Sequence, residues 1–140
     1  MGLTLGTAAP AIFRALIEST AYGARSIVDR FVEEGVRIDG VIALGGVAKK
    51  SPLVMQIVAD VLNKPIKVAS SDQAVALGSA MAAAVAAGVH SSSPKAQEAM
   101  GGGFETEYHP DPAMVRLYEE LYLRYKRFGA FVEGETSHSK

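Results

Sequence analysis

The sequence predicts an α/β fold in which helices alternate with short strands, and two observations lead to this prediction. Between Pro10 and Ala87 the patterns follow the order helix, strand, helix, strand, helix. The clearest strand, 40–44, is apolar throughout, as strands are when helices cover both faces of their sheet. This order favours two adjacent parallel strands joined by a right-handed crossover.

The first helix is predicted from Pro10 to Glu34. Pro10 suits the first turn of a helix, where no backbone N–H is needed, and Gly35 is a residue at which helices commonly end. Apolar residues recur at intervals of three and four, which is the period of a helix with one buried face. They are Phe13, Leu16, Ile17, Ala24, Ile27, Val28 and Phe31.

The predicted strand 40–44 ends at a pair of glycines and is followed by a second helix that ends at Leu62. Ser51 can cap this helix and Pro52 can occupy its first position. A second strand is predicted at 66–68. Asp72 is then a suitable N-cap for a third helix, over 73–87.

The third helix is rich in alanine and carries little side-chain bulk on any face. We expect it to pack very closely beneath the candidate site and to be structural. A short helix over 94–100 and a glycine break follow, and then a final helix that starts at Asp111 and Pro112. The apolar stripe of that last helix contains Met114, Leu117, Leu121, Tyr125 and Phe128. Residues 1–133 are expected to belong to one domain, and 134–140 to form a disordered polar tail.

Composition excludes several classes of function. Lys and Arg total 14 against 15 for Asp and Glu, so the net charge of −1 gives no footprint for nucleic acid or an anionic membrane. No run approaches the roughly 20 apolar residues of a membrane span, and the first ten residues do not resemble a signal peptide. Cysteine is absent, which excludes disulfides and is compatible with a reducing compartment. We therefore expect a soluble, cytoplasmic protein.

The strongest candidate site is the segment from Leu44 to Ser51, where a strand turns into a helix. Two glycines there allow a ligand to approach the backbone, and the helix N-terminus offers free N–H groups and a partial positive charge. A tight turn without a ligand explains the same local pattern equally well. The segment has neither the three-glycine spacing of the dinucleotide fingerprint nor the frame of a P-loop.

Five segments, in order, resemble the C-terminal domain of the FGGY family of carbohydrate kinases. The later part of the chain, with its tyrosine-rich last helix, resembles the ribulokinase branch more than glycerol or xylulose kinases. The segments are Gly2–Thr7, Arg14–Tyr22, Gly45–Leu53, Met55–Leu62 and Ala76–Ala80.

The resemblance implies a partial actin-like, ribonuclease H-like ATPase domain that binds ATP. It assigns Gly45, Gly46 and Val47 to the adenosine part of the nucleotide. Ser51 aligns with a position that is often asparagine in the family, so it either binds adenosine or only caps the helix. Lys49 and its neighbour Lys50 are either phosphate ligands or, as is more usual for loop lysines, solvated.

No catalytic residue and no metal ligand is identified in this chain. Glu18 has no evident carboxylate partner, and the histidines at 90, 109 and 138 lack the spacing of a metal pair. In the family, the sugar pocket, the catalytic aspartate and the phosphate loops lie upstream of the segments quoted above. We therefore expect an inactive C-terminal fragment whose missing N-terminal domain binds the sugar, and whose Mg2+ is held elsewhere in the complete enzyme.

Two functions remain open at this point. The first is the ATP-binding portion of a sugar kinase, with L-ribulose as the expected sugar. The second is a non-catalytic actin-like module that binds nucleotide or a partner. An unpaired sheet edge and uncovered apolar helix faces would also make the isolated chain self-associate.

Overall fold

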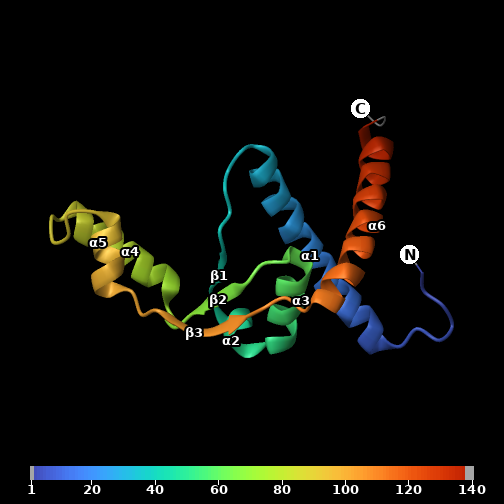
Figure 1. Ribbon diagram of the computed structural model, residues 1–140, viewed down its shortest axis with the longest axis horizontal. Helices are drawn as coiled ribbons and strands as arrows, with labels where there is room; N and C mark the ends of the chain where they lie inside the picture. The colour runs from blue at the N-terminus through green and yellow to red at the C-terminus, as the bar shows by residue number, and fades with distance from the viewer. Residues whose placement is uncertain (1, 138–140) are drawn as a thin grey trace.

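The computed structural model describes residues 2–137 and shows six helices and three strands within that range (Figure 1). The strands form one sheet in the order β1-β2-β3. No helix in the described part of the chain is both long and apolar enough to cross a membrane. The elements are α1 (Ala9–Glu33), β1 (Val41–Ala43), α2 (Gly46–Lys50), α3 (Pro52–Leu62), β2 (Ile66–Ala69), α4 (Ala74–Ala86), α5 (Ser93–Met100), β3 (Phe104–Tyr108) and α6 (Pro112–Ser137).

The predicted α/β fold is confirmed, and β1 and β2 are parallel as expected. Val41 lies opposite Ile66 and Ala43 lies opposite Val68. Because α2 and α3 connect the two strands, the chain returns to the same sheet through a helical crossover. The turn after β1 is thereby placed at the carboxyl end of two neighbouring strands.

Strand β3 was not predicted from the sequence. It pairs antiparallel with β2, so that Ile66 lies opposite Tyr108 and Val68 opposite Thr106. Its two glutamates alternate with aromatic and β-branched residues, Phe104, Thr106 and Tyr108, after a run of three glycines. This pattern is the local signal that could have identified the strand. The third strand brings the 101–108 segment to the candidate site.

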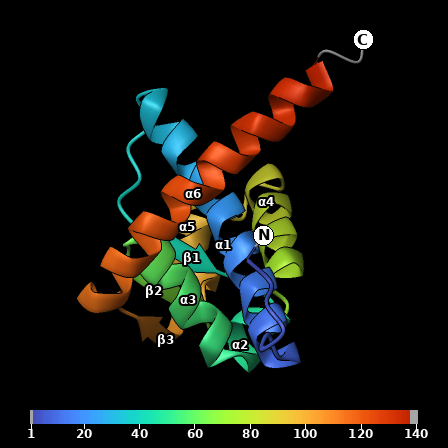
Figure 2. The same cartoon turned by 90° about the vertical axis from the view of Figure 1, so that its right-hand side faces the viewer.

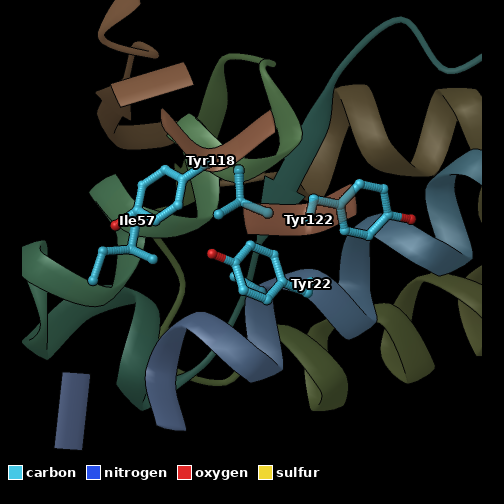
Figure 3. Close-up of a cluster of buried hydrophobic side chains, with 6 residues drawn as sticks. Tyr22, Ile57, Tyr118 and Tyr122 are labelled. Atoms are coloured by element: carbon cyan, nitrogen blue, oxygen red, sulfur yellow. The ribbon is translucent and has the colours of Figure 1, made fainter. Parts of the chain in front are cut away.

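Helix α3 lies between two clusters of buried side chains. On one side, Ile57 and Val61 pack with Tyr22 of α1 and with Tyr118 and Tyr122 of α6 (Figure 3). The Tyr22 ring centroid lies 6.3 Å from that of Tyr118, in an edge-to-face arrangement that aromatic pairs favour. A second cluster joins α3 to the sheet. It contains Ala48, Met55, Ala59, Leu62, Ile66 and Val68.

Burial of β1 on both faces is not observed. β1 is an edge strand, and Ile42 remains 58% exposed. The sequence is apolar enough for a central strand, but within residues 2–137 only β2 pairs with it. An apolar sequence indicates that both faces of a strand favour burial. Whether they are buried depends on which other segments pack against the strand.

The alanine-rich helix α4 does not pack as closely as expected. None of its residues is buried, and a Cβ added at Gly78 would meet no atom within 4 Å. In Figure 1, α4 and α5 lie together at one side, away from the α1, α3 and α6 layer. Small side chains permit another element to approach the helix closely, but they do not determine whether one packs there.

The predicted disordered tail is wrong for residues 134–137, which continue α6 as a helix. Gly134 weakens a helix by only about 1 kcal/mol relative to alanine, and no proline follows it. Figure 2 shows the C-terminal half of α6 projecting away from the other helices. Residues 138–140, including His138, lie outside the described residues.

Candidate functional site

The two glycines of the turn after β1 have different roles. Gly45 has a φ of +86°, a conformation that side chains with a Cβ rarely adopt. Gly46 has no such φ and is the first residue of α2. A Cβ built on Gly46 would meet no protein atom within 4 Å. The backbone conformation at position 45 therefore requires glycine. At position 46 the absence of a side chain leaves open space beside the backbone.

The next residues alternate between solvent and the core. Val47 is 62% exposed, and Ala48 is buried in the cluster beneath α3. Ser51 occupies the N-cap position of α3 as predicted, but its side chain accepts no capping hydrogen bond. Its backbone N–H donates to the Val47 carbonyl over 3.0 Å. The Ser51 hydroxyl is thus not committed to the helix end.

Lys49 is not a solvated loop lysine, because it lies on α2 and its ammonium is paired. Its Nζ donates to the Ser70 carbonyl and to Asp72 Oδ1, each over 2.6 Å. Glu105 Oε2 on β3 lies 3.2 Å from the same nitrogen. The Lys49 side chain is only 18% exposed, whereas Lys50 is exposed. The expectation that Lys49 is a solvated loop lysine is therefore wrong, whereas its role as a phosphate ligand stays a prediction.

The predicted cap role of Asp72 is also wrong. The N-cap of α4 is Gln73, and its N–H donates to the Ser71 hydroxyl oxygen over 3.2 Å. The hydrogen bond from Lys49 lowers the pKa of the Asp72 carboxyl below its ordinary 3.8. That same hydrogen bond raises the pKa of the Lys49 ammonium above 10.5. Both groups are consequently charged at neutral pH.

A cavity of about 500 Å3 opens between the sheet and α4. Leu44, which directly precedes the glycine pair, lies on its wall, but the glycines themselves are not among its lining residues. The wall is mostly apolar. The apolar residues that line the cavity include Ile42, Leu77, Met81 and Phe104.

Asp60 is a buried carboxylate whose role was not recognised from the sequence. It is 3% exposed, and its Oδ1 accepts from Gln56 Nε2 and from the Asp111 N–H, each over 2.8 Å. Gln56 Nε2 also donates to the His109 carbonyl over 2.8 Å. A charged residue on the buried face of an apolar helix was the available signal. These hydrogen bonds join α3 to the start of α6.

The remaining candidates lie outside this site. Glu18 accepts from Arg14 Nε over 2.9 Å and from the Tyr118 hydroxyl over 3.0 Å, so it joins α1 to α6. His109 lies 3.8 Å from Glu107 at the surface. Residues 2–137 contain no group of three His, Cys, Asp or Glu side chains that could hold a metal ion.

Comparison with known proteins identifies the family. Residues 1–87 match the C-terminal domain of the FGGY family of carbohydrate kinases, so the chain belongs to this family. A ribulokinase of Vibrio parahaemolyticus is 48% identical over 131 residues, which are 94% of this chain and 23% of that protein. A ribulokinase of Geobacillus thermodenitrificans is 45% identical over 145 residues, covering 100% of this chain and 26% of that protein. The chain spans about a quarter of the length of these curated relatives.

Solved structures agree with the fold. A xylulose kinase from Rhodospirillum rubrum matches with a TM-score of 0.80 at 26% identity, over 96% of this chain and 27% of its own. A ligand-bound xylulose kinase from Lactobacillus acidophilus matches with a TM-score of 0.84 over 100% of this chain and 28% of its own. At 21% identity the second likeness concerns the fold alone. The family resemblance found in the sequence is confirmed.

Proposed function

We propose that this chain is the nucleotide-side portion of an ATP-dependent sugar kinase that converts ATP and L-ribulose into ADP and L-ribulose 5-phosphate. The supporting observation is its 45–48% identity to ribulokinases from two genera across 94–100% of its length. The proposed reaction belongs to pentose catabolism, the use of arabinose, and the proposed compartment is the cytoplasm.

We assign the adenosine part of ATP to the turn formed by Gly45, Gly46 and Val47, together with Ser51. Open space at Gly46 permits close approach to the backbone, and the exposed Val47 side chain offers an apolar surface to a base. The Ser51 hydroxyl, free of the capping bond, can donate to or accept from the ligand. The turn thus combines open space at Gly46, an apolar surface at Val47 and a free hydroxyl at Ser51.

The transfer of a phosphoryl group also needs a positioned alcohol and groups that neutralise the phosphates, including Mg2+. We assign none of these to residues 2–137, because no carboxylate cluster in that range suits a metal ion. In this proposal the sugar, the metal and the catalytic base are held by the remaining three quarters of the kinase. This chain then contributes the orientation of ATP.

The uncovered surfaces supply a place for that remainder to pack. β1 is apolar, has one free edge and leaves Ile42 exposed, while α4 is apolar and has no buried residue. A strand beside β1 would satisfy the free backbone groups of the edge, and its side chains would cover the sheet. We propose that another segment of the kinase occupies this position.

The proposal is tested with the full-length protein that contains this chain. Phosphorylation of L-ribulose, D-xylulose and glycerol is measured with ATP as the donor, by coupling ADP formation to NADH oxidation. We expect kcat/KM to be highest for L-ribulose. Robust preference for another sugar would change the substrate assignment. The absence of transfer to any sugar, with nucleotide binding retained, would favour the non-catalytic module.

A further inference from the structure

The Lys49 ammonium joins three segments that are distant in the sequence. It lies on α2, which starts at Gly46, and it contacts Ser70 and Asp72 after β2 as well as Glu105 on β3. We call these four residues the Lys49 clamp. The Ser70 backbone N–H also donates to the Gly103 carbonyl over 3.1 Å, which holds the two loops together. The clamp therefore ties the glycine turn to the ends of β2 and β3.

The short helix α2 depends on such contacts. It has five residues, and isolated helices of this length are unstable in water. Ala48 anchors one side of α2 in the core, but its methyl group provides little area. Lys49 provides the other anchor, through a side chain whose stem is largely covered. The position of Gly46 and Val47 relative to the sheet is consequently set from both sides.

The charges of the clamp argue against a direct role in binding phosphate. An ammonium has three N–H donors, and three oxygen acceptors lie within 3.2 Å of Nζ. Two of these acceptors are carboxylates, so the cluster carries a net charge of about −1 at neutral pH. A phosphate group would have to displace one carboxylate and approach the other, which opposes binding by repulsion.

We propose that Lys49 is a positioning residue: it holds the glycine turn in place and so sets the affinity for the nucleotide without touching it. This inference rests on the proposed function, because it concerns the site assigned there to adenosine. It differs from a purely structural role in one measurable respect. Loss of the clamp should weaken the use of ATP and leave the sugar site unaffected.

The first test replaces Lys49 by methionine in the full-length kinase. Methionine keeps an unbranched apolar stem of similar length but removes the charge and the donors. We expect the KM for ATP to rise about tenfold, because small misplacements around a reacting ligand can cost up to about 100-fold. The dissociation constant of the sugar, measured without nucleotide, should not change. Lys49→Arg keeps the charge and should recover most of the affinity, and Lys50→Met is the matched control on the exposed neighbour.

A second variant keeps the test valid if Lys49→Met fails to fold. The pair Asp72→Asn and Glu105→Gln removes both carboxylates from side chains that are 81% and 38% exposed, so it creates no cavity. Backbone amide exchange at residues 45–51 should become faster, and the KM for ATP should rise. Unchanged exchange and unchanged KM would overturn the positioning role.

The outcomes also separate this inference from the function on which it rests. A Gly46→Val substitution tests the adenosine site directly, because a Cβ at this position has open space within 4 Å. If Gly46→Val weakens ATP use and the clamp variants do not, only the inference about Lys49 fails. If Gly46→Val has no effect on ATP use, the assignment of the site itself fails.

Discussion

At the scale of single residues, the glycine pair shows that adjacent glycines can be present for different reasons. Gly45 supplies a backbone conformation, since its φ is +86°. Gly46 leaves open space, and its backbone conformation is one that any residue can adopt. Substitutions at the two positions should therefore affect different properties, one the stability of the fold and the other the binding of a ligand.

Gly46→Val is expected to raise the KM for ATP of the full-length kinase by about tenfold or more, because its two γ-carbons fill the space assigned to adenosine. The affinity for sugar should stay near its original value. Steady-state kinetics with varied ATP, together with sugar binding measured by calorimetry, check this. A folded Gly46→Val enzyme with an unchanged KM for ATP would show that the turn binds no nucleotide.

Gly45→Ala provides the contrasting variant. With a φ of +86° and a ψ of −177°, Gly45 has a conformation that is essentially restricted to glycine. Alanine there costs about 1–3 kcal/mol, so the free energy of unfolding should fall by that amount. Gly46→Ala, in a helical conformation with open space, should leave it nearly unchanged. Urea denaturation of both variants gives the comparison.

At the scale of elements, two polar contacts position helices that local sequence patterns do not place. Asp60 joins α3 to the start of α6. Lys49 joins α2 to the loop before α4 and to β3. In each case the partners are about 20 to 60 positions apart in the chain, so neither contact is visible in a helical or strand period.

Asp60→Ala should lower the free energy of unfolding by about 3 kcal/mol, since it leaves the Asp111 N–H and the Gln56 amide without their buried acceptor. Asp60→Asn keeps one carbonyl oxygen at the same place and should lose less. Chemical denaturation followed by circular dichroism measures both. Equal losses for the two variants would mean that shape, not the acceptor, holds the loop.

The Lys49 clamp should be independent of pH near neutrality and weaken in acid. Because the pKa of Asp72 is lowered in the folded protein, its stabilising effect is present above the unfolded value and is lost as the pH falls through the folded value, below 3.8. Because the pKa of Lys49 is raised, its effect is lost only as the pH rises above 10.5. Amide exchange at residues 45–51, corrected for intrinsic rates, should show protection that falls below pH 3.8 in the original chain. The double variant Asp72→Asn and Glu105→Gln, which removes both carboxylates from the clamp, should lack that step.

At the scale of the whole molecule, the chain has two cores on either side of α3 but leaves several apolar surfaces uncovered. Several of the exposed large apolar residues lie on or directly after β1, on the N-terminal part of α1 and on the C-terminal half of α6. They include Phe13, Leu16, Ile42, Leu44, Phe128, Phe131 and Val132. Exposed apolar patches of this kind, together with a free edge strand, favour association.

The isolated chain is therefore expected to self-associate at high concentration. Light scattering should report a mean mass above that of a monomer and increasing with concentration. Two charged substitutions, Ile42→Lys on the free edge and Phe131→Glu on α6, should reduce this mass without changing the helical content. A clean monomer at high concentration would contradict the argument and favour a self-contained module.

The sequence by itself determined the five longer helices, the parallel pair of strands and the family, because each is encoded in local periods, glycine and proline positions, or ordered motifs. Only the tertiary structure decided which neighbours these segments meet. It added α2 and β3, left β1 at an edge, left α4 unburied and extended α6 to Ser137. It also turned Lys49 from a loop lysine into the centre of an ion cluster, because Glu105 reaches it from another strand. A local pattern specifies which surface a segment prefers to bury, whereas the contacts themselves depend on segments far away in the chain.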